Sequence, residues 1–220
     1  MINLDYSEHP VLDVRFVNDD LFELVLDRNG LEFAPGDCAA IYTTDEKSRP
    51  YSIASGSSED DLRFVIRRMA GGEVSPWLAA RKPGDSIRIT PPFGWFRPGQ
   101  GIGEAPFVFI ATGTGIAPFL SYINTFDRPP EACLYGVRRE ADAIGLPQLA
   151  ESCPTTLAVS REHTEHLHGR VTALLDRLPL DERTHYYGCG LESMVNEVSG
   201  WLLERGIAPR RIHREVFFHG

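Results

Sequence analysis

The feature that most constrains the fold is a change of sequence pattern near residue 100. Before it, short and partly alternating apolar segments such as 11–16 and 21–26 are separated by turns, a pattern that predicts an antiparallel barrel. After it, residues 107–111 form a continuous apolar run, which is typical of a strand buried on both faces of a parallel sheet. Since 220 residues are enough for two domains of roughly 100 residues each, we predict two domains of different architecture.

The first predicted domain is an antiparallel β-barrel over residues 1–98, and a Gly-rich linker over 99–105 follows it. Its strands are expected at 11–16, 21–26, 38–42, 51–54, 62–66 and 86–90, with one helix at 75–81. The second predicted domain covers 106–220, with strands at 107–111, 132–135, 156–159, 184–187 and 212–217 and helices at 116–126, 170–178 and 191–205. This alternation predicts an α/β domain with a parallel sheet and helices on both faces.

Composition and charge exclude several classes of protein. The net charge of −9 makes nucleic acid a poor partner, because phosphate binding needs a basic surface. No apolar run approaches the roughly 20 residues that a membrane span requires, and residues 1–8 lack the basic and apolar regions of a signal peptide, so we expect a cytoplasmic protein. The four cysteines (Cys38, Cys133, Cys153, Cys189) lie too far apart for a zinc finger or a plant-type iron–sulfur site. Electron chemistry in this chain would therefore need an organic cofactor.

The charge is distributed unevenly along the chain. Residues 1–60 contain four Lys/Arg and thirteen Asp/Glu, whereas residues 61–100 contain seven and three. A basic segment in an acidic chain indicates a local anionic ligand or an acidic partner. An ordinary solvated face explains the same charges equally well.

The strongest local motif is Ala111-Thr112-Gly113-Thr114-Gly115-Ile116-Ala117-Pro118, directly after the predicted buried strand. Its glycines allow a tight turn and a close approach to a phosphate, which the start of the following helix favours. Pro118 fits the first turn of that helix. The motif differs from both the G-x-G-x-x-G fingerprint and the P-loop, and a tight turn without a ligand is the alternative.

Two weaker motifs lie in the barrel half. Arg49-Pro50-Tyr51-Ser52 combines a planar donor fork for phosphate, a flat aromatic face and a hydroxyl. Gly71-Gly72-Glu73-Val74-Ser75 precedes the predicted helix, with Ser75 as its expected N-cap and free N–H groups beside Gly72. Taken alone, either motif is compatible with an ordinary strand or a capped helix.

Together these motifs resemble the ferredoxin–NADP reductase superfamily in order and in spacing. Four later segments are similar to the same family: Tyr135-Gly136-Val137-Arg138, Val159-Ser160-Arg161-Glu162, His168-Gly169-Arg170 and Tyr187-Gly188-Cys189-Gly190. The resemblance runs from about residue 10 to the C-terminus. It implies FAD, with FMN less favoured, as the bound flavin, and NADP(H) as the nucleotide.

The resemblance implies a flavin site in the barrel half. Arg49 and the turn from Gly72 to Ser75 would hold the flavin phosphates, Tyr51 would stack on the isoalloxazine, and Ser52 would hydrogen-bond near flavin N5. The implied FAD-binding residues are Arg49, Tyr51, Ser52, Ile66, Gly72, Val74, Ser75, Phe217 and Phe218. Phe217 would cover the flavin until nicotinamide displaces it, with Phe218 towards the adenine. Family members often have Tyr at the stacking position, and a final strand that anchors its aromatics in the core is the alternative.

The nucleotide site implied by the resemblance lies in the second half. Its residues are Gly113, Thr114, Gly115, Arg138, Ser160, Arg161, Arg170, Cys189 and Gly190. Several cations with a Ser hydroxyl suit the 2′-phosphate of NADP, whereas an acidic residue on the ribose would indicate NAD. Glu162 is the one acidic residue in this stretch, but the Ser-Arg-Glu order is similar to NADP-using relatives.

The implied reaction is hydride transfer from NADPH to flavin N5, followed by release of single electrons to a separate carrier, ferredoxin or flavodoxin. Ser52, Thr114, Cys189 and Glu215 would shape the catalytic slot, and Glu215 would relay a proton or only hydrogen-bond. Both carriers tend to be acidic, so we expect a docking face made of Arg67, Arg68, Arg81 and Lys82.

Three alternative functions and two structural expectations complete the prediction. The alternatives are a free-flavin or ferric reductase, a non-catalytic flavin or NADP sensor, and an electron-transfer subunit of a larger complex. The reductase component of a multicomponent oxygenase is disfavoured, because such components usually carry a fused iron–sulfur domain, for which this sequence has no cysteine cluster. Phe93-Gly94-Trp95-Phe96 is expected to close the barrel against the second domain. His163, His166 and His168 are expected on the surface, without a metal.

Overall fold

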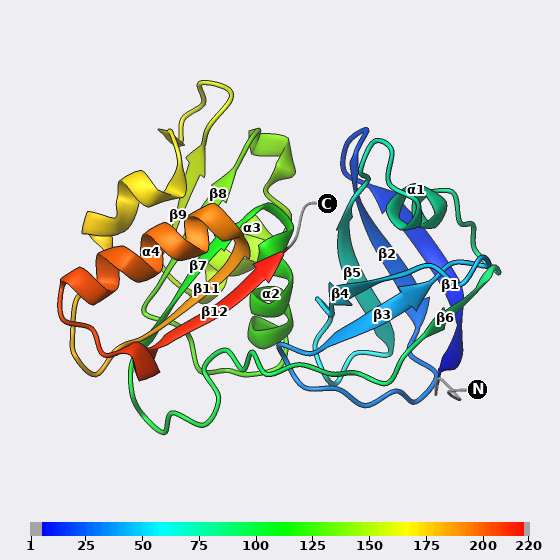
Figure 1. The fold of residues 1–220 in the computed structure, drawn as a ribbon, viewed down its shortest axis with the longest axis horizontal. Coiled ribbons are helices and arrows are strands. Elements are labelled where there is room, and N and C mark those ends of the chain that lie inside the picture. Colours follow the sequence, from blue (N-terminus) through cyan, green and yellow to red (C-terminus); the bar gives the residue numbers. More distant parts are fainter. Residues whose placement is uncertain (1–5, 218–220) are drawn as a thin grey trace.

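The first half of the chain is a six-stranded antiparallel sheet, seen on the right of Figure 1. The computed structural model describes residues 6–217. The strands of this sheet are β1 (Ser7–Phe16), β2 (Leu21–Asp27), β3 (Cys38–Tyr42), β4 (Ser48–Ser52), β5 (Asp61–Arg67) and β6 (Ser86–Ile89). They pair in the order β4-β3-β6-β1-β2-β5. Side chains such as Phe22, Leu24 and Phe64 are fully buried between them and α1 (Val74–Ala79), which contributes Leu78.

The second half is a six-stranded parallel sheet (Figure 1). Its strands are β7 (Phe107–Thr112), β8 (Ala132–Val137), β9 (Thr155–Val159), β10 (Leu167–His168), β11 (His185–Leu191) and β12 (Ile212–Phe217), in the order β10-β9-β8-β7-β11-β12. The chain moves outward from β7 to β10 and returns to the other side of β7 with β11. Such a reversal of strand order creates a crevice at the carboxyl ends of the strands, where α/β proteins bind ligands.

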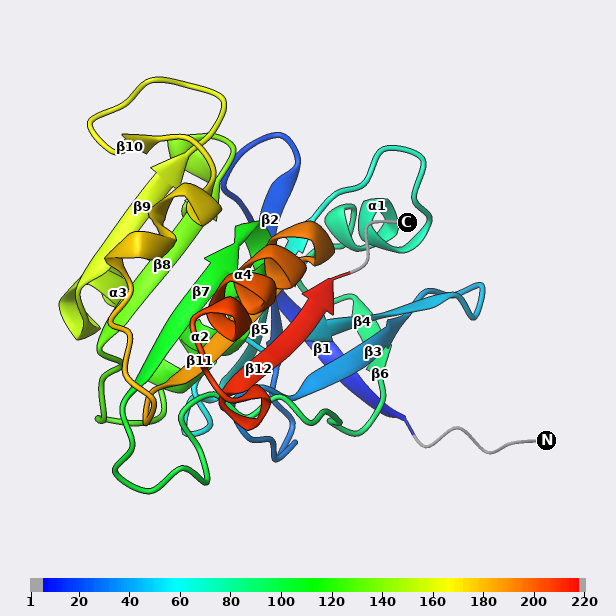
Figure 2. The same cartoon turned by 60° about the vertical axis from the view of Figure 1, so that its left-hand side comes forward.

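Helices cover both faces of the parallel sheet (Figures 1 and 2). On one face, Phe107 and Phe109 of β7 pack with α2 (Ala117–Ile123) and α3 (Leu146–Ser152). On the other face, Val108 and Ile110 pack with α4 (Glu192–Glu204) and with η3 (Val171–Arg177), a 3₁₀ segment. The predicted fold class, an antiparallel barrel followed by an α/β half with a parallel sheet, is confirmed.

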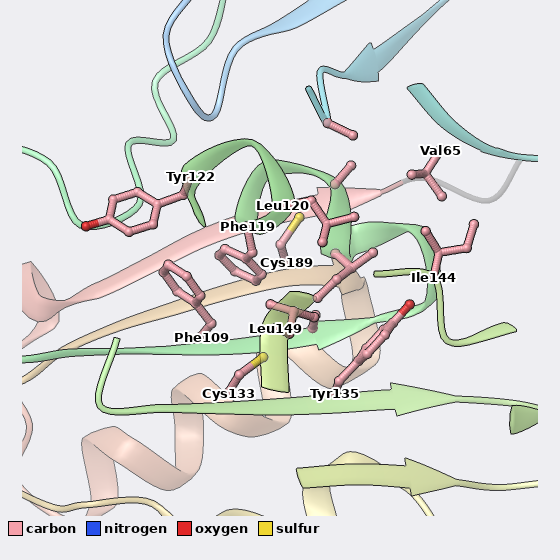
Figure 3. Packing of buried hydrophobic residues seen from close by; sticks show 14 of the residues in the cluster. Val65, Phe109, Phe119, Leu120, Tyr122, Cys133, Tyr135, Ile144, Leu149 and Cys189 are labelled. Atoms are coloured by element: carbon pink, nitrogen blue, oxygen red, sulfur yellow. The ribbon is translucent and has the colours of Figure 1, made fainter. Parts of the chain in front are cut away.

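The two halves share one hydrophobic cluster. Leu21 and Val65 of the first half are buried in the same cluster as Phe119 and Leu120 of α2, and Figure 3 shows Val65 on the side of α2 that faces the first half. Phe96 joins this cluster, with its ring 5.8 Å from the ring of Phe119. The predicted closure by residues 93–96 therefore applies to Phe96, whereas the neighbouring Trp95 is 99% exposed.

Several predicted elements differ from the structure. Helix α3 was not predicted, and the predicted helix at 170–178 is a 3₁₀ segment. The strand expected at 51–54 is β4, which begins at Ser48 and contains Pro50. β4 is the edge strand of its sheet, where Pro removes no essential ladder hydrogen bond. Ser75 is not the N-cap of α1: Glu73 has that position, and the Ser75 Oγ accepts a hydrogen bond from the Met69 backbone N–H at 3.0 Å.

Two predictions remain open at the level of the whole chain. The domain bounds at 98 and 106 stay a prediction, although residues 98–106 contain no strand or helix. Within residues 6–217, no helix combines the length and the apolar character that crossing a bilayer requires. The cytoplasmic location also stays a prediction.

Candidate functional site

A cavity of about 360 Å³ opens at the carboxyl ends of the parallel strands. The ends of β7, β8, β11 and β12 all reach it, as the reversal of strand order predicts. Its lining includes Arg67, Thr112, Gly113, Thr114, Arg138, Ser160, Arg161, Gly169, Arg170, Gly190, Leu191, Ser193, Met194, Glu197 and Phe217. Seven of the nine predicted nucleotide residues are among these, while Gly115 and Cys189 are buried directly behind the lining.

The inner wall of the cavity is formed by closely packed backbone. A Cβ atom on Gly115 would lie 2.4 Å from the carbonyl oxygen of Cys189, and one on Gly190 would lie 2.3 Å from Oγ1 of Thr112. The backbone of Leu191 donates to that same Oγ1 at 2.9 Å. Gly113 has φ +53° and its Cβ position is open, so this turn leaves room for an anion beside it. A backbone cradle of this kind fits a phosphate group.

Cations and hydroxyls surround the mouth of the cavity. The side chains of Arg138, Arg161 and Arg170 are exposed around it, and Ser160 Oγ donates to the Val137 carbonyl at 3.1 Å. This set of donors fits a polyanionic nucleotide. Glu162 does not line the cavity, because its Oε1 accepts a hydrogen bond from the Glu140 backbone N–H at 2.6 Å.

A partly buried polar contact joins the two halves beside this cavity. The Ser52 Oγ of β4 donates to Oε1 of Glu215 on β12 at 3.0 Å, and Glu215 is the register partner of Cys189. Burial raises the pKa of Glu215, against the opposing effects of the Ser52 hydrogen bond and the Arg97 charge. Burial, helped by the nearby Glu215 carboxylate, raises the pKa of Cys189 well above its usual value. The Cys189 thiol therefore stays protonated near neutral pH and is not a ready nucleophile.

The predicted flavin residues have mixed surroundings. Arg49 is exposed, with Nη1 donating to the Ser48 carbonyl at 2.9 Å. Tyr51 is half-buried against the barrel core, and burial raises its pKa to about 12. Gly72 is exposed at the loop before α1. These three residues fit a planar ring with a charged phosphate tail.

Three other predicted flavin residues are engaged by the protein itself. Ile66 is 1% exposed and Val74 is 4% exposed, both in the barrel core. The Ser75 hydroxyl is taken by Met69, as described above. For Ile66 and Val74 only backbone atoms are left for a polar contact with a ligand, whereas the Ser75 hydroxyl still has its proton to donate. Phe217 is half-buried and lines the cavity, whereas Phe218 lies outside the described residues.

The predicted docking face needs a correction at Arg67. Its side chain is 14% exposed, lines the cavity, and pairs with Asp20 at 2.9 Å and with Asp142 at 3.3 Å. Arg67 is thus a residue of the site that sequence reasoning placed on the surface. The only signal was its position at the end of a basic strand. Arg68 and Lys82 are exposed, and the Arg81 guanidinium lies 4.1 Å from the centre of the Trp77 ring.

The predicted surface histidines lie between β9 and η3, with His163 and His166 in the loop and His168 at the end of β10. The rings of His163 and His168 stack with centroids 4.1 Å apart, and His166 Nε2 lies 3.3 Å from Glu140 Oε1. Across the described part of the chain, residues 6–217, no group of three or more His, Cys, Asp or Glu side chains is arranged to hold a metal ion.

Comparison with known proteins gives matches over both halves. Residues 13–97 match the oxidoreductase FAD-binding domain family and residues 109–200 match the oxidoreductase NAD-binding domain family. A ferredoxin–NADP reductase B of Sorangium cellulosum is 31% identical over 195 residues, which cover 78% of this chain and 79% of that protein.

Reductase components of oxygenase systems are also similar. The ferredoxin–NAD(P)(+) reductase component of the naphthalene 1,2-dioxygenase/salicylate 5-hydroxylase systems of Ralstonia sp is 32% identical over 204 residues, covering 86% of this chain and 61% of that protein. The chain spans about three fifths of the length of the first curated relatives that it matches.

The fold is shared with solved structures as well. The crystal structure of a ferredoxin NADP+ reductase from Neisseria gonorrhoeae with bound FAD and NADP has a TM-score of 0.79 at 22% identity, with 97% of both chains covered.

Proposed function

This chain belongs to the ferredoxin–NADP reductase family, and we propose that it is an FAD-dependent oxidoreductase that takes electrons from NADPH and passes them to a separate one-electron carrier. One observation carries the proposal: the cationic cavity at the sheet ends lies beside the Ser52–Glu215 contact, where the two halves meet. A nucleotide in the cavity and a flavin on the barrel half would thus meet at this contact.

The nucleotide end of the proposed site selects a 2′-phosphate. Arg138, Arg161 and Arg170 with the Ser160 hydroxyl would hold the adenylyl end, since a 2′-phosphate carries about two negative charges at neutral pH. The glycine turn at Gly113 would receive the pyrophosphate. Because Glu162 is directed to the Glu140 backbone, its carboxylate does not neutralise these three arginines. This arrangement favours NADPH over NADH.

The flavin end is proposed to use Arg49 for the pyrophosphate and Tyr51 for the ring, with the Gly72 loop beside the phosphates. Bound FAD supplies acceptance of a hydride and release of electrons one at a time. Ser52 has its hydroxyl held by Glu215 at 3.0 Å, which fixes a polar group at the ring edge. Phe217, at the cavity wall, would cover the ring until nicotinamide replaces it.

The test is the absorption spectrum of the purified and desalted protein, before and after anaerobic addition of NADPH and then NADH. We expect a yellow protein that NADPH bleaches much faster than NADH does. A colourless protein that reduces added flavin would instead establish a free-flavin or ferric reductase. Bound flavin that neither nucleotide reduces would establish a sensor or a subunit.

The electron acceptor is proposed to be ferredoxin or flavodoxin, acting as a separate protein. Arg68, Arg81 and Lys82 are the remaining members of the proposed docking face. Reversal of these charges should slow reduction of an acidic carrier protein and leave reduction of a small dye unchanged, because only the carrier needs electrostatic steering. An equal loss with both acceptors would contradict this docking face.

The similarity to oxygenase reductase components favours a second candidate, in which the electrons serve an oxygenase system. Activity with ferredoxins from each type of system distinguishes the two candidates. A rate at least tenfold higher with an oxygenase-associated ferredoxin, about 1.4 kcal/mol of preference, would favour the second.

A further inference from the structure

A polar bridge made of Asn18, Asp20, Arg67 and Asp142 joins the two halves at the edge of the cavity. Arg67 ends β5 in the first half and lines the cavity. Its Nη1 donates to Asp20 Oδ2 at 2.9 Å, and its Nη2 lies 3.3 Å from Asp142 Oδ2. Asp142 belongs to the second half, and its side chain is only 5% exposed. A cation of one half is therefore held by a buried carboxylate of the other.

The loop before β2 is organised to meet Asp142. Asn18 Oδ1 accepts hydrogen bonds from the backbone N–H groups of Asp20 at 3.2 Å and Leu21 at 3.0 Å. Since the amide oxygen is committed in this way, the amide nitrogen must point outward. It donates to Asp142 Oδ1 at 2.8 Å. Both oxygens of the buried carboxylate thus have partners from the first half.

The segment that carries Asp142 also contacts both ends of the cavity. Arg138, at its start, lines the cavity, and the Glu140 N–H binds Glu162 in the loop after β9. The buried Tyr135 hydroxyl lies 3.3 Å from the Gly113 carbonyl and 3.4 Å from the Asp142 carbonyl. This hydroxyl has one proton, so it donates to one carbonyl at a time. The segment therefore borders the cavity at Arg138 and is linked to the Gly113 turn through Tyr135.

We propose that Asp142 is a positioning residue that holds Arg67 over the cavity, so that phosphate binding and the contact between the halves are coupled. A guanidinium has more N–H donors than Asp20 and Asp142 take up, which leaves donors for phosphate oxygens. Two carboxylates fix its rotamer before a ligand arrives, which lowers the entropy lost on binding. Without Asp142, Arg67 keeps only Asp20, whose side chain is 50% exposed. The identity of the ligand as NADP(H) rests on the proposed function.

The test is a double-mutant cycle on the flavin-loaded protein, with Kd for NADP+ and inorganic pyrophosphate and with kcat and KM for NADPH measured using a dye acceptor. We expect Arg67→Gln to raise Kd about tenfold and Asp142→Asn about fivefold, with kcat nearly unchanged. If Asp142 acts through Arg67, the double variant is no weaker than Arg67→Gln, about tenfold. A multiplicative loss of about fiftyfold would overturn the proposal. So would single variants that bind like wild type.

Two further variants keep the test decisive. Arg68→Gln removes the adjacent, exposed cation and should leave both Kd values unchanged. Asn18→Ser keeps an acceptor for the loop N–H groups but loses the donor to Asp142, and should raise Kd about twofold. It replaces Asp142→Asn in the cycle if that variant fails to fold. Wild type that binds pyrophosphate but not NADP+ would refute the proposed nucleotide while the cycle, run with pyrophosphate, still decides the role of Asp142. Wild type that binds neither overturns both.

Discussion

The nucleotide end and the flavin end of the proposed site are built in different ways. At the nucleotide end, the cavity wall is main chain from one half, where Gly115 and Gly190 allow strands and turn to touch. At the flavin end, Arg49 and Tyr51 project from an edge strand, and Glu215 reaches Ser52 from the other half. Backbone packing gives the nucleotide end a fixed shape. Side chains would give the flavin end its affinity for the flavin. Substitutions at the two ends should therefore have different consequences.

The largest effect is expected from Gly115→Ala. The new Cβ would lie 2.4 Å from the Cys189 carbonyl oxygen. Because this Cβ is fixed to its own backbone and the carbonyl is itself backbone, the turn must move. A displacement near 1 Å at a reacting site costs about 100-fold in rate, and we expect that loss in flavin reduction by NADPH. Stopped-flow absorbance measures it, and the flavin itself should remain bound.

Gly113→Ala is the matched control for the glycine turn. Its Cβ meets nothing within 4 Å, but its φ of +53° remains unfavourable for alanine. The folding stability of this variant should therefore fall only by the cost of a left-handed residue, roughly 1 kcal/mol, whereas Gly115→Ala should also lose stability through the clash with Cys189. Equal losses in the two variants would show that close packing against Cys189 does not set the shape of the nucleotide end.

A smaller effect is expected from Arg49→Ala at the flavin end. If Arg49 binds the flavin pyrophosphate, losing this charge-assisted contact should weaken FAD binding by about tenfold to 100-fold, with the fold intact. Flavin retention on desalting and fluorescence titration of the apoprotein measure it. Arg15→Ala, which removes an exposed cation paired with Asp13 on β1, should retain flavin like wild type. An equal loss of flavin from the two variants would mean that Arg49 acts only through its general positive charge and makes no specific contact with the flavin.

The same difference between the ends explains how much could be predicted from sequence. The parallel half could be predicted because strands buried on both faces, such as β7, are continuous apolar runs. The bounds of β12, Ile212–Phe217, were also predicted. The edge strand β4 was placed too late because Pro50 resembles a strand breaker unless its edge position is known. Helix α3 was not predicted, because a short helix that buries only Leu149 gives too little apolar periodicity in the sequence.

Site residues show the same limit. Arg138, Ser160, Arg161 and Arg170 follow strands whose carboxyl ends meet, so topology brings them to one cavity; their role as nucleotide ligands stays a prediction. Arg67 was placed on the surface because its partner Asp142 is distant in sequence. Long-range pairing of this kind leaves no local pattern.

Selectivity between NADPH and NADH should depend on the cations at the nucleotide end. Arg161→Ala should lower the ratio of kcat/KM for NADPH over NADH by about tenfold, because one charged contact to the 2′-phosphate is lost. The rate with NADH should stay unchanged. Arg139→Ala removes an exposed cation that does not line the cavity and should leave the ratio as in wild type. An equal loss of kcat/KM with both nucleotides would mean that Arg161 contacts a group that NADPH and NADH share.

The smallest effect concerns the polar contact that joins the two ends. Burial raises the pKa of Glu215 above 4.5, although the Ser52 hydrogen bond and the Arg97 charge oppose the shift. The folded state therefore binds this proton more tightly than the unfolded state does. The resulting stability is fully present below the unfolded pKa and is lost as the pH rises through the folded pKa. The side chain of Glu215→Gln cannot titrate, so this variant does not lose folding stability in this way as the pH rises.

Thermal unfolding of wild type and Glu215→Gln, compared from pH 4 to pH 8, measures this difference. The Tm of wild type relative to the variant should fall by a few degrees, about 1 kcal/mol or less, as the pH rises through the raised pKa. Glu73→Gln, at an exposed carboxylate paired with Lys47, should show no such fall. A relative Tm that rises with pH would mean that Ser52 and Arg97 outweigh burial. The contact between the halves would then hold a charge at neutral pH, and the flavin end would be electrostatically fixed as firmly as the nucleotide end is fixed by its backbone.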